Sequence, residues 1–239
     1  MAAGPHHGGL RAGPGRRRLA SPAEELPLTP RVIVFAKAPT LGQVKTRLAR
    51  DVGEARALEL YRWCGAAVMD QLRDDRWQTW VTFTPSDQRE ATERWLGPCA
   101  RWIAQRDGDL GERLSAAVDA AFAEGPGPVL LVGTDCVAVT AERIAEALRS
   151  LSTHDAALGP AYDGGYYLLG LARPLPLFEG LAWSTATVAD DTRHRLRRSG
   201  ATWAELPTER DLDEATDLVA VAHRPDAPSW VRVRLSQAP

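Results

Sequence analysis

From residue 31 onward, the sequence alternates between short apolar runs, often β-branched, and longer segments with the spacing of amphipathic helices. The run at 32–36 is typical of a strand buried on both faces, whereas residues 54–73 place their apolar side chains on one helical face. This alternation predicts an α/β, Rossmann-like fold with a mostly parallel sheet and helices on both faces. We expect strands at 32–36, 79–83, 101–104, 129–132, 156–158, 166–171 and 201–206, and helices at 54–73, 87–96, 111–123, 141–151, 185–198 and 214–222.

The 239 residues suit one domain of this class, which we place at 30–225. Residues 1–29 are rich in Gly, Pro and Ala and contain four arginines without a helical period, which predicts a disordered N-terminal tail. A nucleic-acid or partner arm is the alternative for this segment. Residues 226–239 are expected to form a C-terminal tail.

Composition excludes several functional classes. The net charge is −2 and charged residues make up 25%, so nothing global predicts a nucleic-acid binder or a protein of anionic membranes. The longest apolar runs, such as 129–132, are too short to cross a bilayer. The three cysteines, at 64, 99 and 136, have no CxxC spacing, which argues against a zinc site or a disulfide framework and favours the cytoplasm. The sequence does not decide whether the protein forms a homodimer.

In an open α/β sheet, ligands bind beyond the carboxyl ends of the strands, so the residues that follow each strand are the candidates. The segment after the first strand places Lys37, Lys45 and Arg47 around Gly42. It is not a Walker P-loop, because Gly42 lies three residues before Lys45 instead of directly before it. Three cations and a glycine that permits close backbone approach can still bind a diphosphate. The alternative is a solvated basic loop.

The expected central strand is followed by Asp135, which is placed to reach a Mg²⁺ ion bound with substrate phosphates. The alternative, a helix cap, is weakened because five residues separate it from the helix at 141. Asp213 precedes the last expected helix, either as its N-cap or as a second carboxylate on the same ion.

A second group of candidates belongs to the later strands. Asp163 with Gly164 and Gly165 predicts either a hairpin turn or a ligand-lining loop where the carboxylate binds a metal, a ribose or an acceptor hydroxyl. Trp183 and Ser184 precede the helix expected from residue 185, whose N-terminus could receive an anion.

Six sequence blocks in order resemble a known bacterial family. They are FAKAPxxGxVKTRL at 35–48, GDLGER at 108–113, GTDC at 133–136, GPAxDGGYY at 159–167, WST at 183–185 and DLD at 211–213. Together they are similar to the glycosyltransferase-A-like family, also called radical-SAM/selenodomain-associated transferase, of the nucleotide-diphospho-sugar transferase superfamily. Its better-understood relatives are molybdenum-cofactor guanylyltransferases and 2-phospho-L-lactate guanylyltransferase. The resemblance covers residues 31–222, with Val137 where the family usually has Pro and no Asp-x-Asp at 135.

The resemblance implies a GT-A fold with one antiparallel strand, nucleotide binding over the first half and acceptor binding over the second. The residues that it implies for the nucleotide are Lys37, Ala38, Gly42, Lys45, Arg47 and Thr134. Those for the acceptor are Asp163, Gly164, Gly165, Tyr166, Trp183 and Ser184. The resemblance implies that Asp135 and Asp213 bind the metal, Mg²⁺ or Mn²⁺. We expect Lys45, Asp135 and Asp163 to be catalytic.

These features lead to three hypotheses about function. The first is a Mg²⁺-dependent transferase that moves a glycosyl group from a nucleoside-diphosphate sugar to a small-molecule acceptor. The second is nucleotidylyl transfer, in which a phosphorylated acceptor attacks a nucleoside triphosphate and releases pyrophosphate. The third is a non-catalytic nucleotide-binding protein.

Overall fold

A computed structural model describes Met1 and residues 28–223; the tails expected at 1–29 and 226–239 lie almost wholly outside the described residues. The described part of the chain folds around a seven-stranded sheet with the order β3-β2-β1-β4-β6-β5-β7. The strands are β1 (Arg31–Lys37), β2 (Gln78–Thr84), β3 (Arg101–Ala104), β4 (Val129–Gly133), β5 (Ala156–Pro160), β6 (Tyr166–Leu171) and β7 (Trp203–Glu205). Every paired strand is parallel to its neighbour except β6, which runs antiparallel to β4 and β5.

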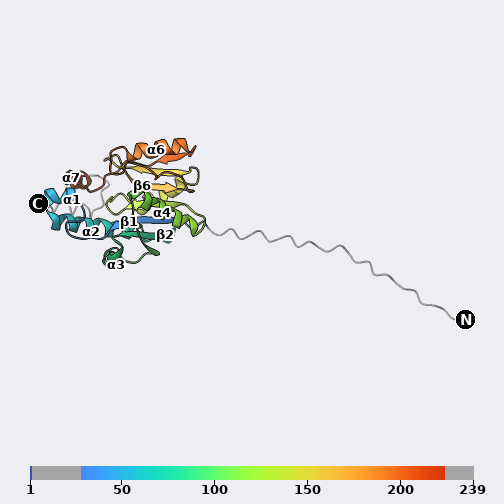
Figure 1. Cartoon of the computed structure of the whole chain (residues 1–239), viewed down its shortest axis with the longest axis horizontal. Helices are drawn as coiled ribbons and strands as arrows, with labels where there is room; N and C mark the ends of the chain where they lie inside the picture. Colours follow the sequence, from blue (N-terminus) through green and yellow to red (C-terminus); the bar gives the residue numbers. More distant parts are fainter. Residues whose placement is uncertain (2–27, 224–239) are drawn as a thin grey trace.

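The helices flank this sheet (Figure 1). They are α1 (Thr46–Val52), α2 (Glu54–Gln71), α3 (Arg89–Leu96), α4 (Leu110–Ala123), α5 (Ala141–Ser150), α6 (Val188–Arg198) and α7 (Ala215–Ala222), with a 3-10 turn η1 (Ser86–Gln88) before α3. The predicted α/β fold, mostly parallel with helices on both faces, is therefore confirmed. Within residues 28–223, no helix is both long and apolar enough to cross a membrane.

The two faces of the sheet carry separate cores because side chains alternate along each strand. Val32 and Val34 of β1 pack in one buried cluster with residues of α2 and α5, while Ile33 between them packs in another with residues of α4. A third cluster joins α1, α2 and α7, so the last helix of the described residues packs against the first two (Figure 1). Leu48 and Leu212 are fully buried members of it.

Three local expectations were wrong. The segment after β1 contains helix α1, which sequence periodicity did not reveal because a seven-residue helix with Leu48 as its one buried side chain is too short to show a period. Helix α6 begins at Val188 instead of 185, because residues 183–187 form turns and a bend before it. The last strand is limited to Trp203–Glu205.

Candidate active site

Lys45 is the centre of a small charged cluster beyond the carboxyl end of β1. Its backbone is left-handed, with φ 48° and ψ 44°, at the residue that directly precedes α1. Its side chain is 7% exposed, and its Nζ lies 2.9 Å from Asp135 Oδ2 and 2.7 Å from Asp213 Oδ1. Arg47 joins the cluster, with Nη2 2.6 Å from Asp213 Oδ2. Four charges from three distant segments therefore converge on one point.

The segment 211–213 is held beside the end of β4 by its backbone. Leu212 N donates to Asp135 O at 3.1 Å, and the Leu212 side chain is buried in the cluster of α1, α2 and α7. Leu212 is buried away from the cavity, whereas Asp211 and Asp213 on either side of it line the same cavity as Asp135.

Neither helix-cap alternative holds for the two predicted metal carboxylates. Helix α5 is capped by Thr140, whose hydroxyl accepts from Arg143 N, so Asp135 is free of that role. Helix α7 is capped by Glu214, and Asp217 accepts from the backbone N of both Asp213 and Glu214. The carboxylate of Asp213 is left to pair with Lys45 and Arg47.

Electrostatics set the charge of this cluster. Burial works against the charge on Lys45, but Asp135 and Asp213 outweigh it and raise its pKa, so the ammonium persists. Burial alone would raise the pKa of Asp135, but the charge and hydrogen bond of Lys45 prevail and lower it. Burial, and then repulsion by Asp135, raise the pKa of Asp211 well above its usual range.

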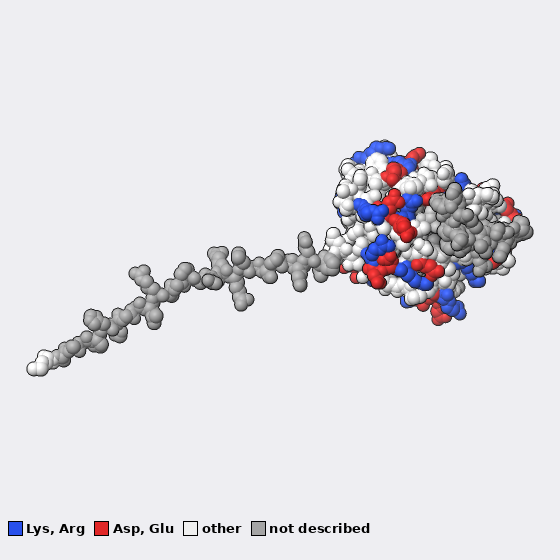
Figure 2. Space-filling model, turned by 180° about the vertical axis from the view of Figure 1, so that it is seen from behind, with Lys and Arg blue, Asp and Glu red and all other residues white. Residues whose placement is uncertain are grey.

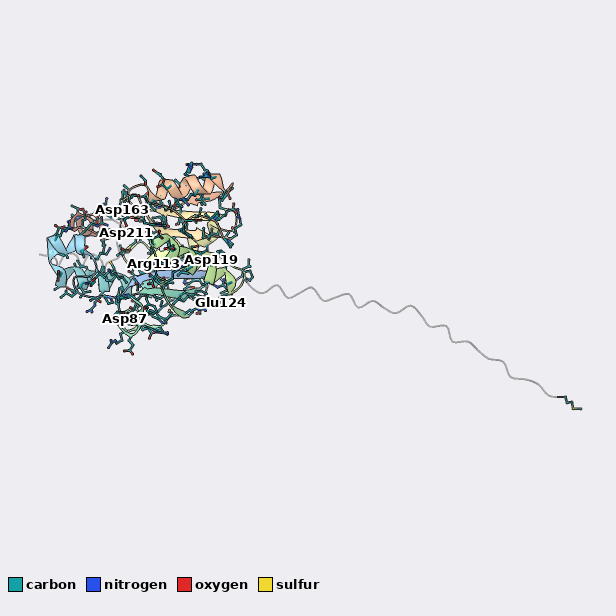
Figure 3. The ribbon with its side chains drawn as sticks, viewed as in Figure 1. Asp87, Arg113, Asp119, Glu124, Asp163 and Asp211 are labelled. Atoms are coloured by element: carbon teal, nitrogen blue, oxygen red, sulfur yellow. The ribbon has the colours of Figure 1, made fainter. Side chains whose placement is uncertain are left out.

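Asp211 is the site residue that sequence reasoning missed. Its Oδ1 is buried and has no hydrogen-bonding partner among the described residues. The available signal was the acidic–apolar–acidic alternation at 211–213, which in an extended segment puts both carboxylates on one side. Figure 3 shows Asp211 and Asp163 at the same end of the sheet, near α1 and α7.

The cluster forms one wall of a cavity of about 860 Å³, large enough for a nucleotide and part of a second molecule. Of the predicted site residues, those that line it are Arg47, Asp135, Asp163, Gly165, Tyr166, Trp183, Ser184 and Asp213. Lys45 reaches this group through its two ion pairs. The predicted nucleotide, metal and acceptor residues are thus adjacent in space, although up to 168 positions separate them along the chain.

Besides Lys45, five predicted residues lie outside the lining of that cavity. Lys37 Nζ donates to Gln43 O at 2.8 Å, and Gly42, with φ 70°, shapes the same turn. Thr134 donates to the Tyr61 hydroxyl, which also bonds the backbone of Lys37. The remaining two are Ala38, which is buried, and Gly164. Lys37, Ala38, Gly42 and Thr134 thus help to hold the loop that carries Lys45.

Gly164 belongs to the turn between β5 and β6, where the expected hairpin is present. Its φ is 89°, and a Cβ there would lie 2.0 Å from Ala186 O, so only glycine fits. Asp163 Oδ1 accepts from Gly165 N at 2.9 Å, and Ala189 N donates to Gly164 O at 2.9 Å. The turn thereby fixes both Asp163 and the start of α6 at the rim of the cavity.

Tyr166 and Trp183 both line the cavity, and each has one polar atom without a hydrogen-bonding partner. The Tyr166 hydroxyl and Trp183 Nε1 are buried without a partner among the described residues. The neighbouring Tyr167 differs, because its hydroxyl donates to Pro207 O at 3.2 Å. Buried polar atoms without partners are uncommon and mark positions where a ligand or a water belongs.

We expect Tyr166→Phe to leave the free energy of unfolding unchanged or to raise it by up to about 1 kcal/mol, because it removes an unsatisfied buried hydroxyl. Tyr167→Phe is the matched control and is expected to cost about 1 kcal/mol, since it breaks a bond that is made. Urea unfolding of both variants without ligand measures the difference. A larger loss for Tyr166→Phe than for Tyr167→Phe would contradict the unmet bond.

Comparison with known proteins agrees with this geometry. The family model described as "Uncharacterized protein conserved in bacteria (DUF2064)" matches residues 67–185. The crystal structure of a "putative nucleotide-diphospho-sugar transferase" from Desulfovibrio desulfuricans G20 is 33% identical, with a TM-score of 0.81, over 87% of this chain and 94% of that one. The chain belongs to the DUF2064 family. No curated protein matches the sequence.

More distant solved structures share this fold. The inositol-1-phosphate CTP transferase from T. maritima is 13% identical, with a TM-score of 0.53, over 88% of this chain and 96% of that one. A nucleotidyl transferase from Methanothermobacter thermautotroptrophicus is 16% identical, with a TM-score of 0.54, over 81% of this chain and 95% of that one. At these identities the likeness shows the shared fold.

The carboxylates of this DUF2064 protein suit a divalent cation in kind. Among residues 28–223, no three His, Cys, Asp or Glu side chains are already arranged as a metal centre, because Asp135 and Asp213 close on the Lys45 ammonium. Asp211 Oδ1 nevertheless lies buried and unpartnered beside them. Oxygen ligands of this type are those that Mg²⁺ and Mn²⁺ take in proteins, so the residues present fit such an ion in chemical kind.

Proposed function

We propose that this protein is a transferase that uses a nucleotide donor with Mg²⁺ or Mn²⁺, and that it transfers a glycosyl group from a nucleoside-diphosphate sugar to a small-molecule acceptor. The observation that carries the proposal is the convergence of Lys45 and Arg47 with Asp135 and Asp213 on the wall of one large cavity. Cations next to metal-type carboxylates are what a phosphate ester bridged by a metal ion requires.

The two cations have distinct tasks in this proposal. Lys45 is buried and stays protonated, so it offers a fixed positive charge that is worth more than an exposed one. Arg47 is 57% exposed at the mouth and can turn its planar guanidinium to a phosphate in two-point contact. As the diphosphate leaves the sugar, both cations stabilise the negative charge that develops on it.

The carboxylates supply the metal site. Asp135 and Asp213, with Asp211 beside them, would hold the ion, which when bound neutralises phosphate oxygens of the donor. Donor phosphates would draw Lys45 away from its carboxylates and so free them for the metal. Asp163, exposed at the rim, is placed to accept the proton of an incoming hydroxyl.

Nucleotidylyl transfer is the second candidate, because the same cation pair could equally stabilise an attacked α-phosphate. The products separate the two reactions: glycosyl transfer releases a nucleoside diphosphate, and nucleotidylyl transfer releases pyrophosphate. A non-catalytic nucleotide-binding protein would release neither product.

The test is a thermal-shift screen of nucleotides and nucleotide sugars with and without Mg²⁺, followed by product analysis with the ligands that bind. A ligand that binds the native state stabilises it, by about 2.7 kcal/mol when its concentration is a hundredfold above its Kd. This stabilisation raises the melting temperature. We expect a nucleoside-diphosphate sugar to give a Mg²⁺-dependent shift and to release nucleoside diphosphate. If no nucleotide shifts the melting temperature, with or without Mg²⁺, the proposal is rejected.

A further inference from the structure

We propose that the acceptor bound in the cavity is an uncharged alcohol with an apolar body, and that phosphorylated acceptors are excluded. This inference rests on the proposed function and deepens it by naming the acceptor class. It also decides between the two transfer reactions, because nucleotidylyl transfer to a phosphorylated acceptor needs a second phosphate in the same cavity.

The first argument is the charge of the cavity lining. Among the described residues that line it, Arg47 is the single cation, against the carboxylates of Asp135, Asp163 and Asp213. The carboxyl group of Asp211, whose pKa burial raises, also lines the cavity and supplies no positive charge. Arg47 is already paired with Asp213, and Lys45 behind the wall is paired with Asp135 and Asp213. Lys45, Arg47 and one divalent ion must balance both these carboxylates and the donor phosphates. A second phosphate would have no cation of its own, and burying it would be costly.

The second argument is that the two helix ends at the cavity offer no anion site. Leu110 at the start of α4 lines the cavity, but Asp109 and Glu112 form a reciprocal capping box there. Val188 at the start of α6 also lines it, but this helix has Asp190 and Asp191 in its first turn. At α4 the chain's own carboxylate therefore occupies the positive end of the helix dipole, and at α6 the two first-turn carboxylates oppose an added anion.

The third argument is the nature of the remaining wall. Apolar side chains of Phe35, Leu114 and Leu131 line the cavity beside Tyr166 and Trp183. The hydroxyl of Tyr166 and Nε1 of Trp183 are buried and, like Asp211 Oδ1, have no partner among the described residues. Apolar walls with a few donors suit a neutral ligand whose oxygen atoms accept hydrogen bonds.

The acceptor step balances without any further reactant. The acceptor hydroxyl oxygen bonds to the anomeric carbon, and the bond between that carbon and the diphosphate oxygen breaks. The hydroxyl proton passes to the carboxylate of Asp163 and on to solvent, while the nucleoside diphosphate leaves with the bonding electrons.

The experiment compares matched probes on the intact protein: 2-phenylethanol with 2-phenylethyl phosphate, and glycerol with glycerol 3-phosphate. Binding is measured by ligand-observed NMR in the presence of Mg²⁺ and the nucleotide that gave the largest Mg²⁺-dependent thermal shift. We expect 2-phenylethanol to bind at least about tenfold more tightly than its phosphate ester. Glycerol, which lacks the apolar body, should bind more weakly than 2-phenylethanol.

A charge variant sharpens the comparison. Leu110→Lys puts a cation at the cavity on a side chain that is 42% exposed, so folding should be spared. We expect it to tighten binding of 2-phenylethyl phosphate by about fivefold to tenfold. Val219→Lys, at an exposed position of α7 outside the cavity lining, is the matched control and should change nothing.

The outcomes separate this inference from the function it rests on. If no nucleotide shifts the melting temperature, the proposed function fails, and the acceptor class fails with it. If a nucleotide binds but the phosphate ester binds as tightly as the alcohol, or neither alcohol binds, the acceptor class is overturned while the nucleotide site stands.

Discussion

Lys45→Met is expected to lower the rate of the transfer reaction by about a hundredfold to a thousandfold, the loss seen when one fixed donor to a developing anion is removed. The side chain keeps its length and loses its charge, so the effect reports on the ammonium. Steady-state kinetics with the nucleotide identified by thermal shift measure it. A rate within threefold of the wild type would contradict a role for Lys45 at the phosphates.

The same variant should also reveal competition between Lys45 and the metal. Without the ammonium, Asp135 and Asp213 lose their shared partner, which is expected to cost about 1–3 kcal/mol because both carboxylates are partly exposed. Mg²⁺ alone should restore part of that loss and raise the melting temperature more in Lys45→Met than in the wild type. Arg50→Met, an exposed change on α1, the helix that Lys45 directly precedes, is the control and should show neither effect.

Asp135→Asn is expected to lower activity by about a thousandfold and to abolish the Mg²⁺-dependent part of nucleotide binding, because the amide keeps the shape and removes the charge that binds the ion. Calorimetric titration of the nucleotide with and without Mg²⁺ measures the binding effect. Asp119→Asn, an exposed aspartate on α4 far from the cluster (Figure 3), is the matched control. Unchanged nucleotide affinity and activity in Asp135→Asn would favour the non-catalytic reading.

The order of strands and helices was predictable because each buried strand shows as a short apolar run between longer helical patterns. Strands such as Arg31–Lys37 and Val129–Gly133 lie at the predicted positions to within one residue. Parallel strands end at one edge, so the predicted candidates after β1 and β4 had to be neighbours. Helix α1 could not be predicted, because seven residues are too few for a hydrophobic period.

The composition of the site was less predictable than its place. Asp211 escaped notice because its importance depends on burial and on Leu212 anchoring the segment, which only the tertiary structure shows. Lys37 and Thr134 belong to two of the six sequence blocks, but neither lines the cavity. Lys37 donates to the backbone of Gln43 and Thr134 donates to Tyr61, which spacing along the chain does not reveal. On the face in Figure 2, basic and acidic side chains are intermixed, so that face gives no competing indication.

The central claim is that one phosphate ester and one divalent ion share the cluster of Lys45, Asp135 and Asp213. A crystal structure with Mn²⁺ and the best-binding nucleotide tests it most directly, since the anomalous signal of Mn²⁺ locates the ion. We predict an ion bound by Asp135 and Asp213 and a phosphate oxygen within hydrogen-bonding distance of Lys45 Nζ. A nucleotide bound elsewhere, with Lys45 still paired to both carboxylates, would contradict the account.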